Sequence, residues 1–169
     1  CIAFGSTRIL EVDEFVLEQD AKVLLTGVSG SGKSVFLRAL TGVLPSSAVR
    51  RGRFTVKNGD GETSTDYDGY RTSSILKDRI AMVFQDAVSS LHPLRPLGRQ
   101  WDEVSGELLS RFNLPAEYFV DKLAKDCSGG ECQRVCLAIA LADEARQILL
   151  MDEPLTDIDL ISRRGIQEY

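Results

Sequence analysis

The chain has 169 residues, 43% of them hydrophobic and 27% charged, a composition typical of one globular domain with a buried core. Its net charge of −5 provides no general basic surface, which argues against tight, unspecific binding to nucleic acid. No apolar run approaches the roughly 20 residues of a membrane-spanning helix, and no basic head followed by an apolar stretch predicts a signal peptide. We therefore expect a cytoplasmic chain.

Apolar runs, glycine-rich turns and helical spacing alternate along the chain in the order of an α/β fold. An apolar strand at 22–26 precedes a glycine-rich turn and a helix at 33–40, which Gly42 and Pro45 should end. The remaining expectations, in chain order, are one or two strands within 9–17, a strand at 53–56, a turn at 58–61 within a polar loop at 58–74, a strand at 80–84, a loop at 86–98, helices at 98–112 and 131–143, and a strand at 147–151.

The predicted helix at 98–112 carries a stripe of apolar side chains on one side, formed by Trp101, Val104, Leu108, Leu109 and Phe112. We interpret this stripe as core packing rather than as a cofactor-binding surface. The helix at 131–143 has a similar apolar side.

Cysteine occurs only at Cys1, Cys127, Cys132 and Cys136. Cys132 and Cys136 are four positions apart on a predicted helix, so they share a face. A zinc site would need a closer pair such as C-x₂-C and further ligands. The preferred interpretation is reduced, partly buried thiols.

Residues 27–34 read GVSGSGKS and fit the pattern G-x₄-G-K-[ST] at every fixed position, between a predicted strand and a predicted helix. Glycines let backbone N–H groups turn inward around phosphate oxygens, and the start of the helix adds positive potential. Lys33 would contact the β and γ phosphates, and Ser34 would offer its hydroxyl to Mg²⁺. The sequence therefore predicts a nucleotide-phosphate loop.

An apolar strand ends in the two acids Asp152 and Glu153. In a phosphate-loop enzyme the first acid helps to hold the Mg²⁺ shell, and the second polarises a water aligned on the γ-phosphate. Because side chains alternate along a strand, adjacent acids point apart, so each can take a separate role.

Residues 127–134 read CSGGECQR. Ser128 can cap a helix, and Gly129 and Gly130 expose backbone N–H groups at its start, which makes a second anion site. This segment resembles the LSGGxxQR signature of ABC ATPases, with Cys127 in place of the leading Leu. The wording of residues 27–42 and 80–93 is closest in style to the ATPase subunits of peptide and nickel importers.

Other positions align with this family by resemblance. Gln85 corresponds to the Q-loop glutamine that senses Mg²⁺ and the attacking water, and residues 156–159 resemble the D-loop, with Asp157 in place of its usual small residue. Phe4 stands about where the family has the aromatic residue that stacks on adenine, and it could equally be an ordinary strand residue.

The resemblance implies an α/β fold: a P-loop NTPase core with an N-terminal antiparallel β subdomain and a small helical subdomain carrying the signature motif. We expect a single ABC ATPase domain over 1–169, truncated at its C-terminus. The core would cover approximately 18–45, 78–86 and 130–169, the β subdomain 1–17 and 46–77, and the helical subdomain 87–129.

The resemblance also implies a site shared between two subunits that pair head to tail, with ATP and Mg²⁺ as the bound species. Nucleotide would be bound by Phe4, Gly27, Ser29, Gly30, Ser31, Gly32, Lys33, Ser34 and Val35, and from the second subunit by Ser128, Gly129 and Gly130. Catalysis would fall to Glu153, Lys33 and Gln85, and Mg²⁺ to Ser34, Gln85 and Asp152. The expected partners are a second ATPase subunit and a membrane permease that docks near residues 86–126 at the cytoplasmic face of the membrane; no nucleic acid is expected.

The family's switch histidine would lie beyond Tyr169, and the one histidine, His92, sits in a loop where it cannot take that role. Three functions stay open at this point. The first is a transporter ATPase that powers import of a small solute. The second is a soluble ABC ATPase of a multi-protein assembly, of the phosphonate C–P lyase or DNA-repair type. The third is a non-catalytic nucleotide-binding module.

Overall fold

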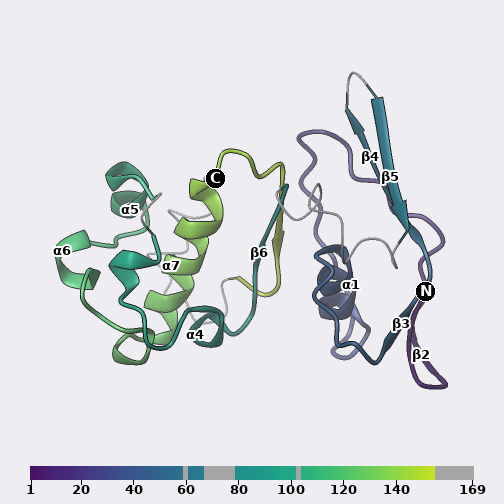
Figure 1. Cartoon of the computed structure of the whole chain (residues 1–169), viewed down its shortest axis with the longest axis horizontal. Coiled ribbons are helices and arrows are strands. Elements are labelled where there is room, and N and C mark those ends of the chain that lie inside the picture. Colours follow the sequence, from purple (N-terminus) through teal and green to yellow (C-terminus); the bar gives the residue numbers. More distant parts are fainter. Residues whose placement is uncertain (59–60, 67–78, 102–103, 155–169) are drawn as a thin grey trace. The chain divides into compact units, whose positions relative to one another are not determined.

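The computed structural model of the chain describes residues 1–58, 61–66, 79–101 and 104–154 (Figure 1). The chain divides into two compact units, an N-terminal unit of Cys1–Lys77 and a C-terminal unit of Asp78–Tyr169.

The N-terminal unit contains a three-stranded antiparallel sheet in the order β2–β1–β3. Its strands are β1 (Ile2–Phe4), β2 (Thr7–Leu10) and β3 (Ala48–Arg50). Ile2 lies opposite Leu10 on one side and Arg50 on the other. Of the segment 9–17, expected to form one or two strands, only Ile9 and Leu10 belong to β2, and residues 11–17 form no strand.

Helix α1 (Lys33–Leu40) has the bounds that the glycine and proline signals predict. Its C-cap Thr41 donates from its backbone N–H to Leu37 and Ala39 carbonyls, and Gly42 follows at φ 71°, a left-handed conformation that ends helices. The buried face of α1 packs into a small apolar cluster around Ile2, Ala39 and Leu44. This cluster holds the helix on the three-stranded sheet.

Strands β4 (Arg53–Asn58) and β5 (Gly61–Asp66) form an antiparallel hairpin with every residue from Arg53 to Asn58 paired. The strand expected at 53–56 is confirmed, and the loop expected at 58–74 is wrong over β5. The sequence of β5, Gly-Glu-Thr-Ser-Thr-Asp, has no apolar alternation to mark it as a strand. Its strand conformation comes from backbone pairing with β4, which composition does not report.

The strand expected at 22–26 is also wrong, because residues 21–28 form neither helix nor strand. Leu24 is 84% exposed and Val23 is 51% exposed. A strand exists only through hydrogen bonds to a neighbour, and the described part of the N-terminal unit pairs no strand with this segment. The apolar composition of this segment predicted a buried strand, but within the N-terminal unit these side chains are exposed.

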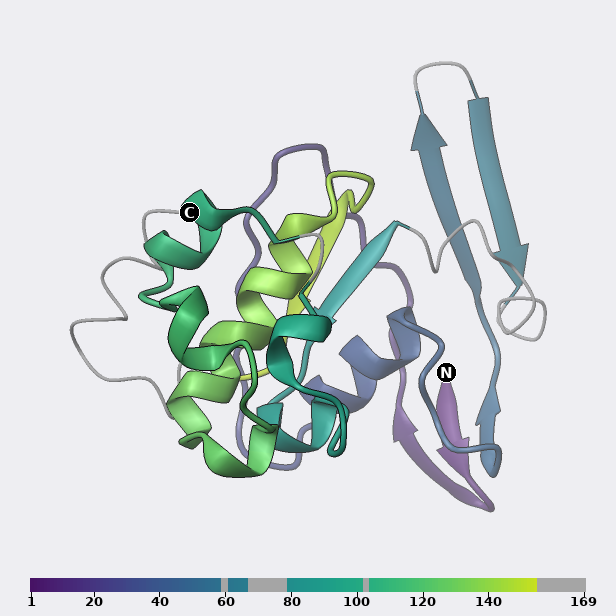
Figure 2. The same ribbon diagram turned by 60° about the vertical axis from the view of Figure 1, so that its left-hand side comes forward.

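In the C-terminal unit, β6 (Ile80–Val83) and β7 (Ile148–Met151) are parallel and paired along their whole length, from Ile80 with Ile148 to Val83 with Met151. Both strands are confirmed predictions. Helix α7 (Gly129–Ala142), also predicted, packs against β6 and against the short helix α4 (Ala87–Ser90), as the turned view also shows (Figure 2). The parallel pair and α7 together bring two strand ends and one helix start into a single unit.

The connection between β6 and α7 consists of short helical turns. They are α4, η1 (Leu97–Arg99), α5 (Gly106–Arg111), α6 (Ala116–Phe119) and η2 (Ala124–Asp126). The long helix expected at 98–112 is wrong: Ser105 is extended and caps α5 by accepting from the Leu108 N–H at 3.2 Å. A serine that bonds the backbone locally starts a helix rather than continuing one. The loop expected at 86–98 is interrupted by α4 and by the start of η1.

The interpretation of the apolar stripe as core is confirmed. Trp101, Leu108, Leu109 and Phe112 are buried in the main cluster of the C-terminal unit, and Val104 packs against it. The same cluster contains Val83 of β6 and Val135, Leu137 and Ala138 of α7. One continuous core therefore supports the strand end at Val83 and the helix α7.

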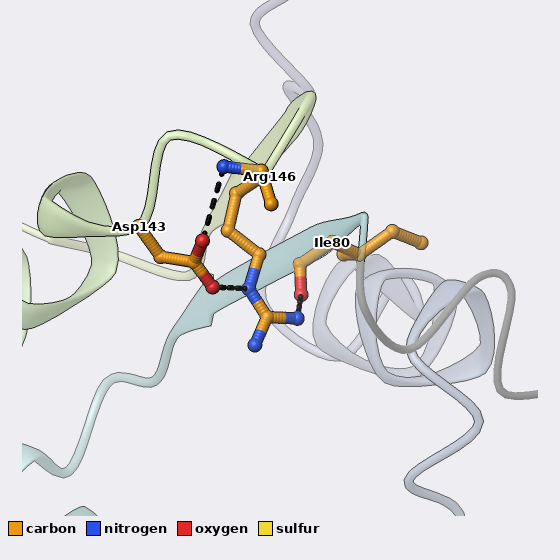
Figure 3. A network of polar contacts seen from close by, with 4 residues as sticks. Ile80, Asp143 and Arg146 are labelled. Atoms are coloured by element: carbon orange, nitrogen blue, oxygen red, sulfur yellow. Dashed lines mark hydrogen bonds and ion pairs between the residues drawn. The ribbon is translucent and has the colours of Figure 1, made fainter.

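A polar network ties the end of α7 to β6 (Figure 3). The Arg146 guanidinium donates to Asp143 Oδ2 at 2.8 Å and to the Ile80 carbonyl at 3.1 Å. Asp143 Oδ1 accepts from the Ala145 N–H at 3.0 Å. These bonds fix the short connection that leads from α7 into β7 and so set the position of the residues at the far end of β7.

Two thiols lie inside this unit. Cys132 is fully buried and donates to the Ala124 carbonyl, and Cys136 donates to the Ala87 carbonyl. Burial raises the pKa of Cys132 to about 11 and that of Cys136 to about 12. Both therefore behave as protonated, packed thiols at neutral pH.

Candidate functional site

The loop before α1 is shaped by glycines in conformations that other residues avoid. Gly30 has φ 79° and Gly32 has φ 93°, both left-handed. A Cβ on Gly27 would meet Ser31 Oγ at 2.8 Å. The turn is closed by the Ser31 N–H, which donates to the Val28 carbonyl at 3.2 Å. Of the two fixed glycines of the pattern, Gly32 is therefore required by its left-handed backbone, and Gly27 lies close to the Ser31 side chain.

Helix α1 begins without a side-chain cap. Its N-cap is Gly32, which makes no side-chain cap hydrogen bond, and no acid lies in the first turn. Arg38 lies in the last turn, where a cation suits the helix dipole. A helix start that offers N–H groups and carries no negative charge is suited to an anion such as phosphate.

The Lys33 side chain donates hydrogen bonds to the backbone of this loop. Its ammonium donates to the Gly27 carbonyl at 2.9 Å and to the Val28 carbonyl at 3.0 Å. These two bonds hold the positive charge beside the α1 start, where the phosphate-loop pattern needs it. The lysine is thus held against the backbone of the loop.

The ends of β6 and β7 bring Gln85 and Glu153 together. The Gln85 amide donates from Nε2 to Glu153 Oε2 at 3.0 Å. The amide oxygen of Gln85 then remains the atom suited to a hard cation, in keeping with the predicted Mg²⁺ role. Sequence positions 68 residues apart become direct neighbours because the two strands are parallel.

Asp152 and Glu153 face different surroundings, but strand alternation is not the cause, because both lie beyond the end of β7. Asp152 is 5% exposed and its N–H donates to the Val83 carbonyl at 2.9 Å, which continues the β6–β7 ladder. Glu153 is exposed and has φ 50°, which is uncommon for a residue other than glycine. The backbone turn at Glu153 directs its carboxylate towards Gln85.

The start of α7 is closed by a reciprocal cap. Ser128 Oγ accepts from the Glu131 N–H at 3.3 Å, and the Glu131 carboxylate accepts from the Ser128 N–H at 2.7 Å and from Ser128 Oγ at 2.9 Å. The Ser128 backbone bond is the main cause that lowers the pKa of Glu131, so this carboxylate is ionised at neutral pH. Cap formation by Ser128 is confirmed.

Glu131 is the residue that sequence reasoning missed. The signal was present, because Ser-x-x-Glu ahead of an apolar helix is a capping-box pattern. Ser128 and Gly129 are exposed and Gly130 is half-buried, so the segment predicted to receive a second subunit's nucleotide lies at the surface of its unit.

The other candidate residues have ordinary surroundings. Phe4 ends β1 and packs against the small cluster of the N-terminal unit, which gives it a structural role whether or not it also stacks on adenine. His92 accepts from the Leu94 N–H at its Nδ1 atom, in a loop that the Gln100 side chain closes by bonding His92 and Arg95. The predicted D-loop at 156–159 lies outside the described residues.

The family model for ABC transporters matches residues 10–156 of this chain. The chain therefore belongs to the ABC transporter family, in the part that binds ATP. The family explains why one chain carries the phosphate loop, the paired acids and the Ser-Gly-Gly signature together.

Curated relatives have names that refer to import and transport. The chain is 30% identical to the dipeptide transport ATP-binding protein DppD of Lactococcus lactis, over 92% of this chain and 49% of the relative. It is 34% identical to a putative peptide import ATP-binding protein of Brucella abortus, over 91% and 50%, and 31% identical to the Fe(3+) ions import ATP-binding protein FbpC 1 of Pectobacterium atrosepticum, over 98% and 46%. The chain spans about half the length of these relatives.

Solved structures agree with the fold class. The chain matches the ATP-binding cassette MJ0796, whose dimeric post-hydrolysis state is bound to ADP and Pi, with a TM-score of 0.59 and 28% identity over 83% of this chain and 64% of that one. A second dimeric structure of the same cassette also has a TM-score of 0.59, with 25% identity. The predicted α/β P-loop NTPase fold is thereby confirmed. Among the residues that the structure describes, no helix is long and apolar enough to span a bilayer.

Proposed function

We propose that the protein containing this chain is the ATP-binding and ATP-hydrolysing subunit of an importer for a small solute. The observation that carries the proposal is the uncapped start of α1 beneath a loop that already holds Lys33 in place. The names of the curated relatives, peptide and Fe(3+) import proteins, favour this function over a soluble assembly ATPase.

The phosphate loop would bind the β and γ phosphates through Lys33 and through backbone N–H groups at Gly30 and Gly32, with Ser29 and Ser31 inside the loop and Val35 directly after it. The side chains proposed for Mg²⁺, namely Ser34, Gln85 and Asp152, offer the oxygen atoms that this cation prefers. Mg²⁺ would neutralise the charge that develops on the phosphates.

Glu153 is the proposed general base. Its carboxylate would accept a proton from the water that attacks the γ-phosphorus, and the Gln85 amide orients that carboxylate through the 3.0 Å bond. Asp152, buried beside it, would serve the cation rather than the water.

A second copy or a related subunit would complete the site with Ser128, Gly129 and Gly130. A permease at the cytoplasmic face of the membrane would change conformation as the pair of subunits closes and opens. The dimeric state of both matched cassette structures supports this pairing.

The test compares the purified protein with two variants. Glu153→Gln removes the base and keeps the size of the side chain, so we expect ATP turnover to fall by at least about 100-fold while Mg-ATP still binds. Lys33→Ala should weaken Mg-ATP binding itself by at least about tenfold, because it removes the only side-chain cation of the loop. Phosphate release and equilibrium binding of a fluorescent ATP analogue are the measurements.

Turnover by Glu153→Gln at the parent's rate would contradict the assignment of the base. Unchanged affinity in Lys33→Ala would contradict the phosphate-loop assignment. Arg8→Ala is the matched control for loss of a cation from the same unit, since the ion pair that Arg8 makes among the described residues is with the exposed Glu11 three residues away.

A further inference from the structure

The hydroxyl of Ser128 is engaged within its own helix start. It donates its hydrogen to Glu131 Oε2 at 2.9 Å and accepts from the Glu131 N–H at 3.3 Å. A serine hydroxyl has one hydrogen to donate. In this arrangement that hydrogen points at a carboxylate of the same chain and is withheld from any other acceptor.

The Glu131 carboxylate also supplies the negative charge that a helix start favours. It accepts from the Ser128 backbone N–H at 2.7 Å, a short distance typical of a charge-assisted bond. Lys122 and Arg134 add favourable charge interactions with it. The first turn of α7 therefore already contains an anion that belongs to the chain.

The start of α1 is built in the opposite way. It has a glycine N-cap, no side-chain cap and no acid in its first turn, whereas α7 has a serine cap bonded to an acid. One helix start is open to phosphate, and the other is occupied by Glu131. The two helix starts predicted to contact phosphate therefore differ in whether an acid of the chain itself is bound there.

We propose that the Glu131 carboxylate competes with the second subunit's ATP for Ser128 and so sets the ATP concentration at which two subunits pair. The proposal rests on the function proposed above, in which Ser128, Gly129 and Gly130 meet the γ-phosphate of a partner. For that contact to form, Ser128 must redirect its hydrogen from Glu131 to a phosphate oxygen. The same carboxylate then lies close to a dianionic phosphate and repels it.

The substitution Glu131→Gln removes the negative charge of the side chain and keeps a residue that can take part in the cap. Glutamine is the other residue found at this position of a capping box, so the helix start is kept. Its neutral oxygen makes a weaker bond to Ser128 and does not repel phosphate. Glu131 is a positioning residue in this account, and its substitution should act on pairing rather than on ATP binding by one subunit.

The experiment measures ATP-dependent dimer formation by sedimentation velocity, with every variant made in a Glu153→Gln background so that ATP is not consumed. Glu131→Gln should lower the ATP concentration at half-maximal dimerisation by about tenfold, equivalent to about 1.4 kcal/mol. Its binding of a fluorescent ATP analogue at protein concentrations too low for pairing should equal that of the parent. Glu131→Ala, which also removes the carboxylate, should shift dimerisation in the same direction and serves if the glutamine variant folds poorly.

Glu107→Gln is the matched control. Glu107 is also an acid in the first turn of a serine-capped helix, α5, but it is exposed and pairs with Arg111 at 2.8 Å. It should leave dimerisation unchanged. An equal shift in Glu107→Gln, or no shift in Glu131→Gln, would overturn the competition proposal while leaving the proposed function intact. Absence of any ATP-dependent dimer in the parent would overturn both.

Discussion

Glu153 combines two features that rarely meet in one residue. Its φ of 50° is one of three positive values among the described non-glycine residues, and its carboxylate accepts the hydrogen bond from Gln85. Backbone strain of this kind costs of order 1 kcal/mol or more and persists where the surroundings hold it. The proposed base is therefore held at a cost in stability, by the β6–β7 ladder on one side and Gln85 on the other.

This cost can be measured with two substitutions that both remove the carboxylate. Glu153→Gly relieves the left-handed strain, while Glu153→Ala keeps it, so we expect the glycine variant to be more stable than the alanine variant by about 1 kcal/mol. The free energies of unfolding of the two variants are compared by urea denaturation. Both variants lose the bond to Gln85, so this loss cancels in the comparison. Equal stability would mean that the turn at Glu153 carries no strain.

The short helical turns between β6 and α7 are held by close contacts rather than by helix propensity. Gly98 in η1 lies against Val120 just after α6, and the Gly98 N–H donates to the Val120 carbonyl at 3.2 Å. A Cβ on Gly98 would meet Val120 backbone atoms at 2.7 and 2.8 Å. Glycine is required here because two backbone segments touch.

Gly98→Ala should therefore lower the free energy of unfolding by about 1–3 kcal/mol, since rigid backbone must move to admit the methyl group. Gly106→Ala is the matched control: its Cβ would have nothing within 4 Å, at the first position of α5. We expect this control to be neutral or more stable by up to about 1 kcal/mol, because alanine favours helix. Chemical denaturation followed by circular dichroism measures both, and equal effects would contradict the contact.

The molecule as a whole consists of two units, and the candidate residues are divided between them. The phosphate loop belongs to the N-terminal unit, and Gln85, Asp152 and Glu153 belong to the C-terminal unit. A ligand that binds only the folded protein stabilises it by mass action.

Mg-ATP at 100 times its dissociation constant should add about 2.7 kcal/mol to the free energy of unfolding. We expect a rise in the thermal midpoint in the Glu153→Gln protein, where ATP persists. At the same Mg-ATP concentration the added Lys33→Ala change should reduce the ligand's contribution to about 1.4 kcal/mol or less, because binding is at least about tenfold weaker. Differential scanning calorimetry with and without Mg-ATP is the measurement. A midpoint that does not move with ligand in the first protein would contradict nucleotide binding by this protein.

The bounds of α1 and the strands β4, β6 and β7 could be predicted because each is announced locally, by glycine and proline signals or by a short apolar run between turns. The polar strand β5 could not, because only its pairing with β4 makes it a strand. The strand predicted at 22–26 is wrong for a related reason. The apolar composition of this segment does not reveal whether a neighbouring strand is present to pair with it.

The sequence by itself determined the chemistry of the candidate site: a phosphate loop, two acids after an apolar strand, a glutamine after another strand and a Ser-Gly-Gly segment before a helix. Each of these patterns consists of residues that are close together in the chain, so it can be recognised without knowledge of the fold. Only the tertiary structure decided that Gln85 bonds Glu153 and that Asp152 is buried while Glu153 is exposed. The physical reason is that a parallel strand pair joins positions far apart in the chain, and that burial is a property of the packed core rather than of the residue.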